Sequence, residues 1–132
     1  MPVAQKEFYK EFLQMNTRKV GIEGESVAVE YLKKSGYKIL ERNFSNRTGE
    51  IDIIAQDKDY IVFVEVKSRE NTKYGMPIES ITIQKARKII RTAECYLLYK
   101  KKGNSPCRFD VIEVLRGEVN HIKNAYDKSD LY

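Results

Sequence analysis

The sequence predicts one α/β domain with a mixed five-stranded sheet and helices on both faces. Two runs rich in β-branched residues, 51–54 and 61–66, flank a short polar turn and indicate a β-hairpin. A long segment with helical periodicity separates this hairpin from the apolar run CRFDVIEVL. A helical connection of that length predicts two parallel neighbouring strands joined by a right-handed crossover.

Length and composition fit this class. The chain has 132 residues, 42% hydrophobic and 33% charged, which indicates one soluble globular domain over 1–132. No apolar run approaches the roughly 20 residues of a membrane span, and the N-terminus lacks the apolar core of a signal peptide. We therefore expect a cytoplasmic protein without membrane contact and with its two cysteines reduced. A single histidine argues against zinc sites and histidine-based acid–base catalysis.

The N-terminal third predicts two helices and a strand. Residues 4–15 have helical spacing and form either a short amphipathic helix or an arm. A second helix begins near Asn16 or Thr17, either of which can cap it, and stops at Gly36. The segment 37–43 is the first strand, so the core spans 16–124 and a tail without a strong signal covers 125–132.

The remaining elements complete the sheet. The hairpin supplies strands two and three, and the long helix begins near Ser80 or Thr82 and ends by Gly103. CRFDVIEVL is strand four, and Gly117 turns the chain into strand five at 118–123. The predicted order is 1-2-3-4-5, with strands two and five antiparallel to the others.

Three charged residues interrupt the apolar hairpin: Asp52, Glu65 and Lys67. Such residues are costly in central strands unless they are paired or bind a metal. Glu65 and Lys67 share a face by alternation, and Asp52 joins them if the two-residue loop is either 57–58 or 58–59. Two carboxylates about 4 Å apart repel by roughly 4 kcal/mol at an effective dielectric near 20, and a divalent cation would relieve this. Oxygen ligands favour Mg²⁺, with Mn²⁺ as a substitute.

A plainer interpretation remains open for each of these residues. A strand with one wet face also carries alternating charges. Glu25, at the edge of the apolar stripe of the second helix, is by itself more typical of a solvated helix residue.

Positive charge is concentrated in one segment. Residues 78–102 carry seven basic and two acidic side chains, which equals the net charge of +5 of the whole chain. Basic side chains beside an acidic pocket suit a protein that binds phosphates, although a solvated helix face explains them equally well. The candidate nucleic-acid contacts are Arg47, Lys73, Lys85, Arg87, Lys88 and Arg91.

At this point the chain resembles a known family. An Asp on one strand, Glu-x-Lys on the next and a Glu on a preceding helix resemble the metal site of the PD-(D/E)XK nuclease superfamily. More narrowly, GEIDIIA and VFVEVKSR, with GIEGESVAVEYLKKSGYKILERN, SITIQKARKI, CRFDVIEV and HIKNAY, resemble the YraN family of predicted bacterial endonucleases, distant relatives of Holliday-junction resolvases. The proline of the superfamily motif is replaced by Ile51.

The resemblance implies a restriction-endonuclease-like three-layer fold and a role for each matching residue. Asp52 and Glu65 would be the metal-binding carboxylates, Lys67 the lysine of the motif, and Glu25 an assistant to metal or water. Glu50 and Asp110 also match the family pattern, and we interpret Asp110 as a structural residue or a residue that supports the metal ligands, rather than as a ligand. By analogy with resolvases, a homodimer is a further expectation.

We therefore expect a Mg²⁺- or Mn²⁺-dependent endonuclease acting on DNA, branched DNA among the candidates. The alternative is a nuclease-like fold without catalysis that serves as a nucleic-acid-binding or adaptor module. A purely protein-binding role is a third interpretation.

Overall fold

The computed structural model describes residues 24–69 and 81–131 of the chain. Its elements, in order, are a helix over residues 24–34, β1 (Lys38–Ser45), β2 (Glu50–Asp57), β3 (Tyr60–Arg69), α2 (Ile83–Tyr99), β4 (Cys107–Leu115), β5 (Glu118–Tyr126) and α3 (Lys128–Leu131).

The five strands form one mixed sheet in the order β1-β2-β3-β4-β5. β3 and β4 are parallel, whereas the other three neighbouring pairs are antiparallel. The predicted fold class, strand order and strand directions are therefore confirmed. The helical connection between β3 and β4 is the reason that these two strands can run in the same direction.

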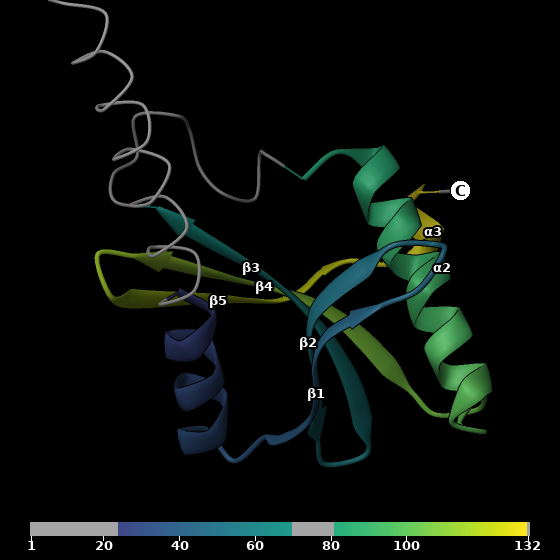
Figure 1. Ribbon diagram of the computed structural model, residues 1–132, viewed down its shortest axis with the longest axis horizontal. Helices are drawn as coiled ribbons and strands as arrows, with labels where there is room; N and C mark the ends of the chain where they lie inside the picture. Colours follow the sequence, from purple (N-terminus) through teal and green to yellow (C-terminus); the bar gives the residue numbers. More distant parts are fainter. Residues whose placement is uncertain (1–23, 70–80, 132) are drawn as a thin grey trace, which may run out of the picture.

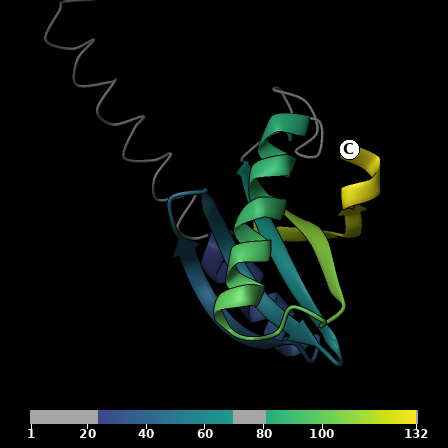
Figure 2. The same cartoon turned by 90° about the vertical axis from the view of Figure 1, so that its right-hand side faces the viewer.

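Two apolar cores lie on opposite faces of this sheet. The helix at residues 24–34 packs Ala28 and Leu32 against one face, over Val62 and Val64 of β3. α2 covers the other face with a stripe that includes Ile89, Ile90, Ala93, Tyr96 and Leu97, packed over Phe63 and Phe109. Figure 2 shows α2 in front of the sheet and the first described helix behind it. The result is a three-layer arrangement of helix, sheet and helix (Figure 1).

The hairpin between β2 and β3 has a defined register. Asp57 pairs with Tyr60 and Ile53 pairs with Val64, so the loop is Lys58-Asp59. This is the second of the two loops that place Asp52 on the face of Glu65. Lys58 takes a positive φ of 55°, a conformation that a tight turn of this kind can require.

The long helix α2 begins next to Thr82, one of the two start positions predicted from the sequence. Thr82 is the N-cap, and its hydroxyl accepts a hydrogen bond from the backbone N–H of Lys85 at 3.0 Å. Capping at this position fixes the first turn of α2 at the end of the sheet where the candidate site lies.

The C-terminal segment differs from the prediction. β5 continues to Tyr126 instead of ending at residue 123, and α3 follows in the segment where the sequence carries no strong signal. The extended strand contains a register irregularity opposite Phe109 and Val111, with Asn124 at a positive φ of 51°. The predicted helix at 4–15, the start of the second helix, and the loop with Lys73 lie outside the described residues.

Among the residues that the structure describes, no helix is both long enough and apolar enough to cross a membrane.

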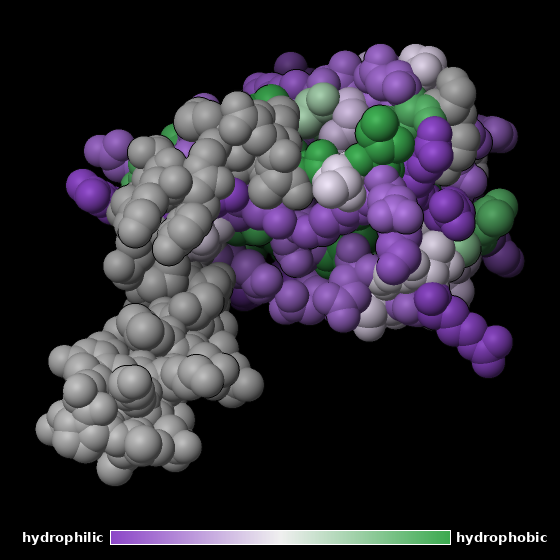
Figure 3. Space-filling view, turned by 90° about the horizontal axis from the view of Figure 1, so that it is seen from above, coloured by the Kyte–Doolittle hydropathy of each residue, from purple (hydrophilic) through white to green (hydrophobic). Residues whose placement is uncertain are grey.

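Figure 3 looks down on the end of the molecule where α2 begins, and the described surface there is largely hydrophilic with scattered apolar residues. A polar surface at this end suits a polar or charged ligand.

Candidate functional site

Two carboxylates from neighbouring central strands meet at the end of the hairpin ladder. The ladder between β2 and β3 runs from Asp57–Tyr60 to Ile53–Val64. One residue further, the carboxylate of Asp52 accepts a hydrogen bond at 2.8 Å from the backbone N–H of Val66. This bond holds the Asp52 side chain against β3, beside Glu65.

The environment of Asp52 favours its protonated form. Burial, the negative charge of Glu65 and, more weakly, that of Glu25 raise the pKa of Asp52 from 3.8 to about 7, against the opposing hydrogen bond from Val66. Asp52, Glu65 and Glu25, three of the four predicted catalytic residues, are therefore close enough to interact electrostatically. Glu25 belongs to the helix at residues 24–34 and is half-buried.

Glu65 is buried, with 8% of its surface exposed, and two lysines neutralise it. Its Oε1 lies 2.6 Å from Nζ of Lys85 and 3.5 Å from Nζ of Lys67. Lys67 shares strand β3 with Glu65, whereas Lys85 reaches across from the first turn of α2. The structure thus brings all three charged residues of the hairpin together and adds a lysine from the helix.

The two lysines differ in their protonation behaviour. Burial and the neighbouring Lys85 lower the pKa of Lys67, partly offset by Glu65. Burial also acts to lower the pKa of Lys85, but its contacts with Glu65 and Lys67 outweigh burial and raise that pKa. Lys85 is therefore the more firmly charged partner of Glu65.

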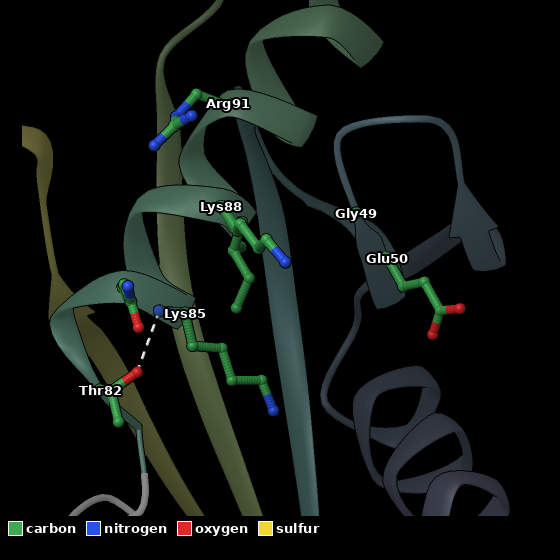
Figure 4. Close-up of a pocket in the computed structure, with 8 residues that line it drawn as sticks. Gly49, Glu50, Thr82, Lys85, Lys88 and Arg91 are labelled. Atoms are coloured by element: carbon green, nitrogen blue, oxygen red, sulfur yellow. Dashed lines mark hydrogen bonds between the residues drawn. The ribbon is translucent and has the colours of Figure 1, made fainter.

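A cavity of about 680 Å³ adjoins the site along α2. It is lined by Gly49, Glu50, Thr82, Gln84, Lys85, Lys88, Ile89 and Arg91. Lys85, Lys88 and Arg91 recur at every third residue of α2, so they project from consecutive turns, and Lys85 and Lys88 extend toward the strand side (Figure 4). Three basic side chains beside a buried carboxylate pair can hold anionic groups next to the acidic site.

The other predicted contacts lie elsewhere. Arg47 is exposed in the turn between β1 and β2 and does not line this cavity. Arg87 donates from Nε at 2.9 Å, and also from Nη2, to the carbonyl of Leu131, so it ties α3 to α2. Lys73 lies outside the described residues.

A second charged cluster lies on the opposite face of the sheet. Asp110 is fully buried and accepts hydrogen bonds from Arg108 (2.9 and 3.0 Å), from the backbone of Asn124 (3.0 Å) and from His121 (2.7 Å). The other ring nitrogen of His121 lies 3.1 Å from the hydroxyl of Tyr31. Burial acts to raise the pKa of Asp110, but these hydrogen bonds outweigh it and lower that pKa. The structure therefore places Asp110 in a buried hydrogen-bond network on the other face of the sheet, away from Asp52 and Glu65.

Two residues near the site were missed from the sequence. Glu113 is buried on β4 and pairs in register with Lys67, so it lies on the face of Glu65. The sequence signal for Glu113 is its spacing of two residues from the apolar Val111 and four from Phe109, which predicts that all three side chains lie on the same face of the strand. Tyr126 stacks on Phe109, and burial together with the charge of Glu65 raises its pKa, but it fell in the region predicted as a tail.

Among the described residues, no group of three or more His, Cys, Asp or Glu side chains is arranged to hold a metal ion. The oxygen donors at the site are therefore the pair Asp52 and Glu65. Mg²⁺ characteristically uses only one or two protein carboxylates and completes its shell with water and substrate phosphates, so this pair fits such an ion.

Residues 24–114 match the family described as "Uncharacterised protein family UPF0102". A UPF0102 protein of Persephonella marina is 56% identical over 107 residues, which cover 81% of this chain and 92% of the relative. One from Clostridioides difficile is 52% identical over 114 residues, covering 85% of this chain and all of the relative. One from Lachnoclostridium phytofermentans is 51% identical over 114 residues, covering 86% and 97%. The chain belongs to the UPF0102 family.

Proposed function

We propose that this protein is a divalent-metal-dependent endonuclease that hydrolyses phosphodiester bonds in DNA, with branched DNA as a favoured substrate. The observation that carries the proposal is the meeting of Asp52 and Glu65 on adjacent central strands, with Lys67 on the same face. We also place the chain with the YraN family and the PD-(D/E)XK nuclease superfamily, which its motifs resemble and with which the three-layer fold is consistent.

The energetics of the carboxylate pair support a cation-binding role. A folded protein gains little by burying two acids side by side, and the raised pKa of Asp52 measures that cost. Asp52 and Glu65 would hold the metal ion. A bound Mg²⁺ or Mn²⁺ supplies Lewis-acid stabilisation of phosphate charge and lowers the pKa of a water molecule.

The remaining residues have roles that follow from their positions. Lys67, partly buried on β3 beside Glu65, would place its ammonium against the negative charge that develops on the scissile phosphate. Glu25 contributes negative charge at Asp52 and would strengthen cation binding there. Lys88 and Arg91 would hold neighbouring backbone phosphates in the cavity without reading base sequence.

Incubation of the full chain with four labelled substrates tests the proposal: a four-way junction, a flap, a linear duplex and single-stranded DNA, each with Mn²⁺ and with EDTA. We expect Mn²⁺-dependent cleavage that is strongest on the branched substrates. Lys67→Ala and Asp52→Asn should each lower the rate by at least about 100-fold.

The controls separate the enzyme from its alternatives. Cleavage that persists at the full rate in Lys67→Ala would identify a contaminating nuclease. Salt-dependent DNA binding without cleavage under any metal condition would overturn the proposal in favour of a binding or adaptor module. An RNA copy of each substrate, assayed in parallel, determines which nucleic acid is cut.

A further inference from the structure

The ammonium of Lys85 neutralises one of the two carboxylates that would hold the proposed metal ion. Its Nζ lies 2.6 Å from Oε1 of Glu65, the shorter of the two lysine contacts to that oxygen. Two ammonium groups, from Lys67 and Lys85, already neutralise Oε1 of Glu65. Their positive charge repels a divalent cation, so departure of one ammonium from Glu65 would favour binding of the cation.

Lys85 is the ammonium that can leave. Lys67 is tethered to the strand that carries Glu65, and its side chain is 22% exposed, whereas the side chain of Lys85 is 41% exposed. Lys85 also lines the basic cavity together with Lys88 and Arg91 (Figure 4). A rotation of its long side chain can transfer the ammonium from Glu65 into that cavity without any change in the backbone.

We propose that Lys85 is an internal competitor of the divalent cation, which neutralises Glu65 in the metal-free protein and moves to a nucleic-acid phosphate in the cavity when the cation binds. This inference rests on the proposed function and adds a coupling to it. A phosphate in the cavity attracts Lys85 away from Glu65 and so favours cation binding. Because such linkage is reciprocal, the cation also strengthens binding of the nucleic acid.

Mn²⁺ binding, measured by isothermal titration calorimetry, tests the coupling without relying on catalysis. The probes are Mn²⁺ alone and Mn²⁺ in the presence of a saturating duplex with nuclease-resistant phosphorothioate linkages. For the wild type, we expect the duplex to increase Mn²⁺ affinity by about fivefold or more. For Lys85→Met, we expect Mn²⁺ alone to bind more tightly than to the wild type by a similar factor, with no further gain from the duplex.

Lys88→Met is the matched control, because it removes the same charge from the next turn of α2 and from the same cavity but has no ion pair with Glu65 in the described structure. It should weaken duplex binding yet keep the gain in Mn²⁺ affinity once duplex is saturating. Lys85→Arg retains the positive charge, so its Mn²⁺ affinity, with and without duplex, should follow that of the wild type.

Three other results of these titrations would each overturn the inference. Equal Mn²⁺ affinity in the wild type and Lys85→Met would overturn the competition while leaving the proposed metal site intact. If Lys88→Met matched Lys85→Met in both titrations, the change in Mn²⁺ affinity would come from the loss of any positive charge near the site. That result would also overturn the competition between Lys85 and the cation. Mn²⁺ binding by none of the proteins would remove the metal site and the inference together.

Discussion

At the scale of single residues, the site depends on a carboxyl group whose environment opposes its ionisation. Asp52 accepts a hydrogen bond from the backbone of Val66, but burial and the charge of Glu65 oppose its ionisation. Alternation along the strands and the choice of loop were enough to predict that Asp52, Glu65 and Lys67 converge. Position in the first turn of the long helix makes Gln84 and Lys85 the candidates to face the site, and Lys85 does so. Its pairing with Glu65 in particular was not predictable, because it depends on how α2 packs on the sheet.

Asp52→Asn should stabilise the protein at pH 8. The pKa of Asp52 is raised from 3.8 to about 7 in the folded state, so its contribution to stability is fully present below pH 4 and is lost as the pH rises to 7. Asparagine can still accept the hydrogen bond from Val66 but carries no charge. We expect a gain on the order of 1–3 kcal/mol in the free energy of unfolding at pH 8, shrinking toward zero near pH 4.

Urea unfolding monitored by circular dichroism at the two pH values measures this difference. Glu50→Gln, which neutralises an exposed carboxylate on the same strand, is the control for net charge. If Asp52→Asn were no more stable than the wild type at pH 8, burial and the charge of Glu65 would not oppose ionisation of Asp52 as we infer.

Asp110→Asn should be strongly destabilising. The substitution leaves the guanidinium of Arg108 without its closest buried carboxylate, and the buried imidazole of His121 loses the same partner. Removing one member of a buried ion pair typically costs about 3–5 kcal/mol. Thermal unfolding should show a large drop in melting temperature, whereas Asp130→Asn, at an exposed position in α3, should leave it within a degree or two. A small shift for Asp110→Asn would contradict a structural role.

At the scale of secondary-structure elements, the close approach of the first described helix to β3 fixes the position of Glu25. Gly24 is buried, and a Cβ added to it would lie 2.5 Å from both Cβ and Oγ of Ser68. A glycine in a helix costs roughly 1 kcal/mol of helix propensity relative to alanine, so its presence is typical of a close approach of that helix to the sheet. The sequence does not indicate the partner strand, because helix and strand are far apart in the chain.

Gly24→Ala should therefore destabilise the protein in spite of the higher helix propensity of alanine. The overlap forces the helix or the strand to shift, at a cost of about 1–3 kcal/mol. Removing the Cβ of residue 68 in the double variant Gly24→Ala/Ser68→Gly should recover part of that loss, because the clash disappears. Chemical denaturation of the four proteins of this cycle gives the coupling energy, and additive effects would contradict direct contact between the two positions.

The C-terminal elements show why the sequence alone placed strand ends incorrectly. Lys123 and Asn124 are polar and interrupt the strand pattern of the sequence. β5 nevertheless continues past them because the backbone N–H of Asn124 finds its acceptor in the buried carboxylate of Asp110. A hydrogen bond between side chain and backbone across strands depends on the tertiary structure, which local patterns do not encode.

At the scale of the whole molecule, the acidic pair and the row of basic side chains lie side by side at one end of the sheet. The sequence predicted the excess of positive charge in this segment but not its division into two surfaces. Lys85, Lys88 and Arg91 line the cavity, whereas Arg87 is bonded to α3. Helical spacing separates Arg87 from Lys85, Lys88 and Arg91, and the contact of Arg87 with α3 follows from the packing of that helix against α2.

Binding of duplex DNA should therefore depend on the cavity more than on overall charge. We expect Lys88→Glu/Arg91→Glu to weaken binding in low salt and to reduce the slope of log K against log salt by about 2. Lys101→Glu/Lys102→Glu makes the same change in net charge beyond the C-terminal end of α2 and should have a smaller effect. Fluorescence anisotropy at several salt concentrations measures both slopes, and equal losses would contradict a localised phosphate site.

A divalent-cation site formed by Asp52 and Glu65 should be visible in a crystal soaked in Mn²⁺. We expect an anomalous difference peak between the two carboxylates, about 2.0–2.3 Å from an oxygen of each, with the ammonium of Lys85 displaced from Glu65. Crystals without a peak at this position, still showing the ion pair between Lys85 and Glu65 at millimolar Mn²⁺, would contradict this prediction.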